Sequence, residues 1–579
     1  MTGLDGSDVV QCLKEKKTLY HVSEGTGISC TGAVRWRGVY VFMRMKVSDY
    51  IARKLVDEGI SDVFMVTGGG AMHLDDGLGH EPGLHCTFNH HEQACAIAAE
   101  CYARIHNKIA AVCVTTGPGG TNAITGVVGG WLDSIPILIL SGQVRYDTTA
   151  RSTGLGIRAL GDQEFEITKA IDCMTKYCEM VIDPMRIRFC LEKALYLAQT
   201  GRPGPCWLDI PLNVQGAYVE TEELLGFDKN DYEAGGTGWS VHGSGCDGCG
   251  LCAGKLIQGK PAMIPEDEAG KGEKRELLPP SVSLDLAREI VKKVREAKRP
   301  VINAGNGIRI GKAFDVFQRV VEMLGIPVVT GWNSLDCMYD SHPLYVGRAG
   351  HMGDRPGNFA VQNCDLLLSL GSRLSIRQVG YNYPTWAREA YVIYNDIDAE
   401  ELKKPTVHVD MPVHADVKDL LEKMEMVLEV EAVSADGGPK DKEAVDWWIS
   451  RCQQWKEKYP VVLPKHYEAG EDQPANIYAA IKEISRRAEE DQITVVGNGS
   501  PCVVGGHAYE MKKGQRFISN SAIASMGYDL PAAIGACLAD HTKDIILVTG
   551  DGSIQMNLQE LQTIIHNHLP IKIFLINNG

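Results

Sequence analysis

Two polar residues that follow neighbouring apolar runs could hold a metal ion together. Asp551 lies in a G-D-G-S turn directly after the apolar run 545–548, and Asn578 follows the run 571–576. These runs predict buried parallel strands, and the helix-like spacing between them predicts a crossover helix. A right-handed crossover brings the carboxyl ends of both strands to one edge of the sheet. Asp551 and Asn578 are therefore expected to lie close together.

Carboxylate and amide oxygens are hard ligands that suit Mg²⁺, which usually binds few protein groups together with phosphate oxygens. Gly550 and Gly552 let the backbone approach a phosphate closely, and Ser553 completes the turn. An acidic turn after a strand is, by itself, more often a loop or a helix cap. The Asn pair that ends at Asn578, 27 residues after Asp551, favours a magnesium diphosphate site.

Composition limits the class of protein. The chain has 579 residues, 44% of them hydrophobic, and a net charge of −16. This length predicts two to four domains, and the acidic balance argues against nucleic acids or acidic membranes as main partners. Charged or polar residues interrupt every apolar run before it could span a bilayer. The 18 cysteines are scattered through apolar segments, so most are expected to be core residues in a reducing cytoplasm.

From Val47 onward, strand-like and helix-like segments alternate, which predicts open α/β sheets with ligand loops at the strand ends. Stretches rich in Gly, Pro and charge interrupt this alternation twice. Residues 1–42 show neither periodicity nor a signal-peptide pattern, so Met43 or Met45 is a plausible start. The expected organisation is a disordered extension (1–44), a first domain (45–219), a linker with an insert (220–280), a central domain (281–430), a linker and helix (431–473) and a last domain (474–579).

Several motifs, in order, resemble those of thiamine diphosphate (ThDP) enzymes of the acetolactate synthase group. They are NHHEQACAIAAECYAR, TTGPGGTNAITGVVGGWLDSIPILILSGQ, GRPGPCWLDIP, SNSAIASMGYDLPAAIGA and the GDGS…NN unit. The resemblance covers roughly Lys46 to Gly579, apart from the insert. It implies three doubly wound open-sheet domains: pyrimidine-binding, central nucleotide-binding-like and diphosphate-binding.

The resemblance makes Glu92 the central catalytic candidate. In the family, this carboxylate hydrogen-bonds the aminopyrimidine ring and favours the imino tautomer, whose exocyclic nitrogen removes the thiazolium proton. Such a role needs a carboxylate in an apolar site, where its pKa and proton position can be tuned. Taken alone, a Glu at a helix start is more often a cap or an exposed charge.

The same resemblance assigns cofactor contacts in the first domain. Gly117, Gly119 and Asn122 are expected to shape the cofactor or acyl pocket, and Gln143 is a candidate polar contact. Each of these residues also fits a simple turn before a helix.

In the last domain, Gly497 and Asn498 follow a strand and are expected to bind the cofactor. Met526 matches the bulky residue that separates the two rings of ThDP in the family, although a Met before Gly is otherwise most often a core residue.

Two departures from the family affect the acceptor side of the site. Gln163 matches the family's active-site Gln, but Asp162 replaces the Phe that packs on the substrate, and Phe165 is out of register. Leu212 replaces a Lys and cannot supply its charge. Both changes bear on the second substrate and leave cofactor activation unchanged.

The insert contains Cys246, Cys249 and Cys252 at a spacing that resembles part of an iron–sulfur or zinc site. His242 is the candidate for the fourth ligand. The alternative is a flexible Gly-rich excursion with incidental thiols.

The central domain resembles the domain that holds FAD in acetolactate synthases without net redox work. The matching pieces are NAGNG, GHMGDRPGNFAV, LGSR with Arg373, and NDID with Asp396, and Arg202 reaches in from the first domain. Related enzymes use this domain for other nucleotides or leave it empty. The family's GMHG turn appears here as Gly350-His351-Met352-Gly353.

These features predict a Mg²⁺- and ThDP-dependent transferase in branched-chain amino acid biosynthesis, which decarboxylates pyruvate or another 2-keto acid and transfers the hydroxyethyl unit to a second carbonyl compound. The alternatives are a related ThDP lyase, decarboxylase or transferase with another acceptor, such as a ketosugar, or a flavin and iron–sulfur redox module. The resemblance implies a homodimer or homotetramer with Glu92 acting across the interface, and the sequence is silent on a regulatory subunit. Because only Gly579 follows Asn578, we expect the chain to be truncated one residue before the last family ligand.

Overall fold

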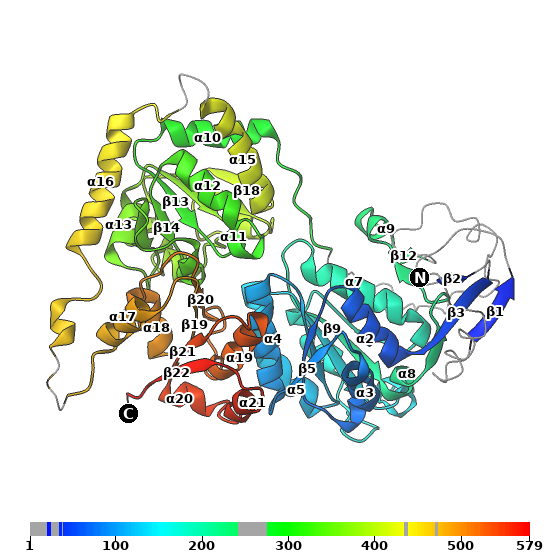
Figure 1. The fold of residues 1–579 in the computed structure, drawn as a ribbon. Coiled ribbons are helices and arrows are strands. Elements are labelled where there is room, and N and C mark those ends of the chain that lie inside the picture. Colours follow the sequence, from blue (N-terminus) through cyan, green and yellow to red (C-terminus); the bar gives the residue numbers. More distant parts are fainter. Residues whose placement is uncertain are drawn as a thin grey trace.

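The computed structural model describes residues 20–24, 34–36, 39–240, 275–432, 438–468, 470 and 473–578. These residues form three α/β units in chain order, and each unit is built on its own parallel sheet (Figure 1). No helix in these ranges has both the length and the apolar character that a bilayer span requires.

The first sheet has the strand order β5-β4-β6-β7-β9-β8, and every pair in it is parallel. Its central strands are buried along their whole length, as continuous apolar runs predict. Its elements are α2 (Val47–Asp57), β4 (Asp62–Met65), α3 (Met72–His80), β5 (His85–Phe88), α4 (Glu92–His106), β6 (Ala110–Val114), α5 (Pro118–Asp133), β7 (Ile137–Gln143), β8 (Tyr177–Met180), α7 (Ile187–Gln199) and β9 (Cys206–Pro211).

The central sheet has the order β15-β14-β13-β16-β17-β18 and is also parallel. Its elements are α10 (Leu284–Glu296), β13 (Pro300–Ala304), α12 (Phe314–Leu324), β14 (Val328–Thr330), β15 (Tyr345–Arg348), α13 (Arg355–Asn363), β16 (Leu366–Leu370), β17 (Tyr391–Asp396), β18 (Met411–His414) and α15 (Val417–Ala432). The long helix α16 (Lys442–Lys458) follows and packs on this unit: the buried indole of Trp448 donates a hydrogen bond to the carbonyl of Pro300 at 3.1 Å.

The third sheet has the order β20-β19-β21-β22. Gly550 pairs with Ile576 in parallel register, so the carboxyl ends of β21 and β22 lie at one edge, which confirms the predicted crossover. The elements are α17 (Ile477–Arg487), β19 (Ile493–Val496), α18 (Ser500–Ala508), β20 (Arg516–Ile518), α19 (Asp529–Ala539), β21 (Ile545–Gly550), α20 (Asp551–Gln555), α21 (Glu560–His566) and β22 (Ile571–Ile576).

Helix α4 joins the first unit to the third. It packs on α5 on one side and on α19 on the other, and Figure 1 shows it at the border between the two sheets. The approach of α19 is close, because Gly535 leaves room for the carbonyl of Ala98 where a side chain would collide. Glu92, at the start of α4, therefore lies on the helix that forms the boundary between the first and third units.

The structure differs from two expectations about irregular segments. Part of the extension 1–44 forms strands β1 (Tyr20–Glu24), β2 (Val34–Trp36) and β3 (Val39–Lys46), so disorder was the wrong prediction for those residues. Strand β3 pairs with the distant β10 (Tyr218–Glu220), and a pairing partner so far along the chain leaves no local pattern to read.

The start of the linker 220–280 is also ordered, since it contains β11 (Gly226–Phe227), α9 (Lys229–Glu233) and β12 (Trp239–Ser240). The Trp239 ring stacks on Phe189 of α7 with centroids 4.0 Å apart. The cysteines of the insert and His242 lie outside the described residues.

Candidate active site

The predicted metal ligands lie at the carboxyl edge of the third sheet. Asp551 begins α20 directly after β21, and Asn578 follows β22. The Asn578 amide donates to Ser500 Oγ at 3.2 Å, which leaves its oxygen free to face a cation. Within the described residues, the Asp551 carboxylate has no hydrogen bond or ion pair. A carboxylate and an amide oxygen at one sheet edge form a donor set that fits Mg²⁺ shared with a diphosphate.

Met526 lies over this acidic turn. A Cβ atom added to Gly552 would be 3.1 Å from Met526 Cε, and 45% of the Met526 side chain is exposed. The next residue, Gly527, donates its N–H to Ser553 Oγ at 3.0 Å. Ser553 is buried and its hydroxyl holds the Met526 loop, while its contact with a cofactor stays a prediction.

Asn498 holds the loop that carries Met526 by hydrogen bonds. Its buried amide donates to the carbonyl of Ser525 at 2.6 Å and to the side chain of Asn520. Gly497 lies against Asp529, whose pKa is raised by burial and which accepts a hydrogen bond from the Thr549 hydroxyl. Gly497 and Asn498 therefore hold in place the segment that carries Met526, while their direct contact with a cofactor stays a prediction.

Glu92 stands at the N-terminus of α4, and its carboxylate is oriented by a neighbouring helix. Asn122, from the first turns of α5, donates its amide to Glu92 Oε2 at 3.0 Å. His91 caps α4 by accepting the N–H of Gln93 at 3.1 Å. Glu92 begins α4 and Asn122 lies in the first turns of α5, so the N-terminal parts of the two helices meet at this carboxylate. The structure thus brings together two residues that the sequence singled out separately.

Two residues that the sequence did not single out, Asn557 and Glu560, connect the start of α4 with the segment around the Met526 loop. The amide of Asn557 donates to Gln93 Oε1 at 3.1 Å and to the carbonyl of Gly527 at 2.7 Å. The buried Glu560 accepts from Asn89 Nδ2 at 2.9 Å. Nothing in the local pattern distinguishes Asn557 or Glu560 from surface helix residues, because their partners lie more than four hundred residues away in the chain.

Gln163 and Gly117 meet at the edge of the first sheet. A Cβ atom at Gly117, which has φ of +63°, would collide with the carbonyl oxygen of Gln163. Gln163 itself adopts φ of +61°, a strained conformation for a non-glycine residue and one that clusters at functional sites. Asp162 beside it is exposed, and Leu212 is half-buried at the end of β9.

Gln143 and Gly119 lie behind the predicted pocket. The Gln143 amide, only 1% exposed, donates to the carbonyl of Phe165 at 2.9 Å and to Asp209 Oδ2 at 3.0 Å. Gln143 therefore holds the loop that carries Gln163, and its direct contact with the cofactor stays a prediction. Gly119 is buried in the first turn of α5 and packs on Thr115.

Asp209 predicts a dependence of stability on pH. Burial raises its pKa to about 7, against hydrogen bonds from Ser141 Oγ and Gln143. Because this pKa lies above the unfolded one, the stabilising contribution is fully present below about pH 4 and is lost as the pH rises through about 7. The difference of about three between the folded and unfolded pKa of Asp209 corresponds to at most about 4 kcal/mol of folding stability. We expect the urea midpoint of the wild type to fall over this range more steeply than that of Asp209→Asn; equal slopes would contradict the assignment.

A cavity of about 380 Å³ lies where the three units meet. Its walls are the turns at the ends of five strands of the central sheet, two segments of the first unit and a segment of the third. The lining includes Arg202, Gly305, Gly307, Asn333, Gly371, Arg373, Asp396, Asp416 and Ser521. The structure therefore unites the NAGNG, LGSR and NDID motifs with Arg202, as the sequence predicted. The sequence did not single out Asp416 as a ligand-binding candidate, although it closely follows the end of β18, where ligand-binding residues are common.

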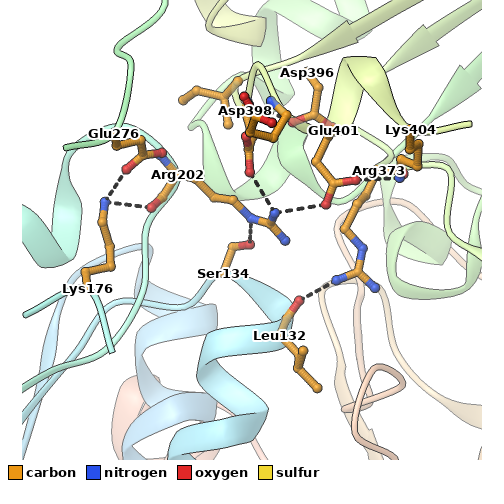
Figure 2. A network of polar contacts seen from close by, with 12 residues as sticks. Leu132, Ser134, Lys176, Arg202, Glu276, Arg373, Asp396, Asp398, Glu401 and Lys404 are labelled. Carbon is orange, nitrogen blue, oxygen red and sulfur yellow. Dashed lines mark hydrogen bonds and ion pairs between the residues drawn. The ribbon is translucent and has the colours of Figure 1, made fainter. Parts of the chain in front are cut away.

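Arg202 crosses the boundary between the first and central units (Figure 2). Its guanidinium donates to Asp398 at 3.1 Å and to Glu401 at 3.0 Å, and its Nε donates to Ser134 Oγ at 2.9 Å. Burial opposes its charge, but the nearby carboxylates outweigh this effect and hold the pKa of Arg202 above its usual value. Arg373 makes a second crossing by donating to the carbonyl of Leu132 at 2.9 Å.

The backbone of Arg202 is also fixed, as Figure 2 shows. Its N–H donates to Glu276 at 2.6 Å, and Lys176 pairs with Glu276 at 2.8 Å. Asp396 lies deeper: burial raises its pKa, and its oxygens accept from the Tyr394 hydroxyl and from the N–H of Asp398. The cavity thus combines two guanidinium groups with carboxylates on glycine-lined turns, a donor set that fits a nucleotide.

Models of thiamine pyrophosphate enzymes match all three units of the chain. The N-terminal TPP binding domain matches residues 45–164, the central domain matches residues 287–424, and the C-terminal TPP binding domain matches residues 497–579. The fold and the site therefore define a chain with the complete three-domain order of ThDP enzymes.

Curated relatives narrow this class. The chain is 30% identical to the probable acetolactate synthase large subunit of Methanococcus aeolicus, with 92% of this chain and 80% of the relative covered. The acetolactate synthase large subunit of Lactococcus lactis gives the same identity and coverage, and acetolactate synthase 3 of Brassica napus gives 30% with 92% and 72% covered. This protein belongs to the acetolactate synthase large-subunit family of thiamine diphosphate enzymes.

Proposed function

We propose that this chain is an acetolactate synthase-type transferase, which removes CO₂ from pyruvate or another 2-keto acid and joins the remaining two-carbon unit to a second carbonyl compound. The observation that carries the proposal is the Glu92–Asn122 pair at two converging helix N-termini, in a chain whose relatives are acetolactate synthases. When bound, ThDP would supply a ring carbon that is nucleophilic once its proton is removed, and a cationic ring that can accept the electron pair released with CO₂.

The residues of the chain then have separate tasks. Glu92 holds the proton that tunes the aminopyrimidine, and the Asn122 amide keeps its carboxylate in position. Asp551 and the oxygen of Asn578 hold Mg²⁺, which in turn binds the diphosphate. Met526, above the acidic turn, sets the shape of the cofactor. Gln163 borders the substrate opposite the Gly117 turn.

We propose FAD as the ligand of the cavity between the three units. Arg202 and Arg373 provide charge for its diphosphate, and the Gly305, Gly307 and Gly371 turns allow the close approach that phosphates need. The exchanged turn at Gly350–Gly353 lies outside the cavity lining, so this proposal rests on Arg202 and on the NAGNG, LGSR and NDID motifs.

Arg202→Met keeps a long side chain and removes the charge. We expect a tenfold to hundredfold weaker FAD affinity, because hydrogen bonds to charged groups contribute about 1.5–3 kcal/mol. Quenching of flavin fluorescence on titration measures this affinity, and Arg288→Met, which changes an exposed Arg of the central unit that pairs with Asp285, is the control. Equal affinities for both variants would contradict the assignment.

We further propose a homodimer, with Glu92 facing the diphosphate half of a second copy, in the cytoplasm and in branched-chain amino acid biosynthesis. Exposed apolar side chains around the acidic turn support this assembly: Met526, Met556 and Leu558 are 45%, 56% and 42% exposed. Surfaces of this kind mark interaction sites. The buried free thiols along the chain fit a reducing compartment.

Product analysis tests the proposed reaction. Purified protein with ThDP, Mg²⁺ and pyruvate is expected to form acetolactate, as followed by NMR. Pyruvate consumption without acetolactate would overturn the proposal. A panel of ketosugar acceptors covers the second candidate reaction, which the exposed Asp162 and the apolar Leu212 favour, and a product that forms only with such an acceptor would establish it.

A further inference from the structure

The Glu164 carboxylate closes the loop that carries Gln163. Its Oε1 accepts the N–H of Ala150 at 2.6 Å, and its Oε2 accepts the N–H groups of Leu160 at 2.7 Å and Gly161 at 3.1 Å. One side chain therefore satisfies three backbone donors from the two ends of a ten-residue excursion. Carboxylates accept such hydrogen bonds more strongly than neutral groups do.

Gln163 is held between fixed neighbours. Glu164 anchors Gln163 on one side, and the carbonyl of Gln163 is packed against Gly117. Two residues on, the carbonyl of Phe165 is held by the buried amide of Gln143. The strained φ of Gln163 persists only because the surrounding contacts determine it. Loss of the Glu164 contacts leaves that conformation free to relax.

We propose that Glu164 is a positioning residue, which holds Gln163 in the conformation that faces the 2-keto acid. The proposal rests on the proposed function, because the role of Gln163 comes from it. Glu164 has no direct part in binding ThDP, so its removal changes the KM for the 2-keto acid and leaves the cofactor affinity unaltered. Removal of a residue that only stabilises the fold has a different effect, because it lowers cofactor affinity and activity together.

The first experiment compares Glu164→Gln with the wild type by hydrogen exchange. An amide side chain has one acceptor oxygen and cannot serve both ends of the loop, so peptides that contain Ala150, Leu160 and Gly161 are expected to exchange about tenfold faster. The matched control is Glu166→Gln on the same loop, where Glu166 pairs with Arg151 and Thr168 instead. Unchanged exchange in Glu164→Gln overturns the proposal.

The second experiment is a double-mutant cycle with Gln163→Ala, read as the KM for pyruvate at saturating ThDP. We expect Glu164→Gln to raise KM about tenfold in the wild type and less than twofold in Gln163→Ala, with the ThDP affinity unchanged. An equal rise in both backgrounds overturns the link to Gln163. If the wild type fails to consume pyruvate, the proposed function fails, and the hydrogen-exchange result still decides whether Glu164 holds the loop.

Discussion

Glu92→Gln is expected to lower the kcat for pyruvate consumption by about 10²- to 10⁴-fold, the range that a positioned acid–base group contributes. The change removes the carboxylate and keeps the shape of the side chain. The amide of Asn122, 3.0 Å from Glu92 Oε2, can donate to the new carboxamide oxygen, so the two helix N-termini keep their arrangement. The affinity for ThDP is accordingly expected to change by only a few fold.

Steady-state kinetics at saturating ThDP and calorimetric titration of the cofactor separate these two quantities. Glu58→Gln is the matched control, since Glu58 is exposed on the same unit and pairs with Lys54. A Glu92→Gln variant that keeps more than a tenth of the wild-type kcat would show that this carboxylate is not the proton-holding group.

Asp551→Ala is expected to weaken ThDP binding about hundredfold or more and to abolish its dependence on Mg²⁺. A metal that bridges the protein and a diphosphate contributes several kcal/mol, and this variant removes its predicted carboxylate ligand. The side chain has no hydrogen bond or ion pair within those residues, so its loss costs the fold little.

Strand β21 offers the matched control for this variant. Asp544, which precedes the other end of the strand, pairs with Lys572 at 2.6 Å and lies away from the predicted diphosphate. Calorimetric titrations at several Mg²⁺ concentrations should show wild-type affinity in Asp544→Ala. Equal affinities in Asp544→Ala and Asp551→Ala would place the metal elsewhere.

Continuous apolar runs made the parallel strands the most predictable part of the fold. The bounds of β22 coincide with the predicted run 571–576, and β21 contains the predicted run 545–548, but β22 is only partly buried, which corrects the prediction that both strands are buried. Strands buried on both faces read as unbroken apolar segments, and the polar residues that end them mark the edge where ligands bind. For this reason Asp551 and Asn578 could be placed at strand ends from the sequence, whereas Arg373 and Asp396 were assigned by the family resemblance.

The direction of a polar side chain at such an edge could not be predicted. Gln143 and Ser553 follow the same pattern as Asp551, yet both are buried and hold loops from behind. Glu164 reads as an ordinary acidic loop residue, and its three backbone partners depend on how the loop closes. Asn557 acts through distant residues of the first unit, which only the packing of the units brings near.

The central claim, that this chain binds ThDP and activates it through Glu92, is tested most directly by the exchange of the cofactor's thiazolium ring proton in D₂O without substrate. We predict that the wild-type holoprotein exchanges this proton at least about a hundredfold faster than free ThDP, and that Glu92→Gln loses this acceleration. Exchange in the wild type no faster than in free ThDP, or equally fast in Glu92→Gln, would contradict the account.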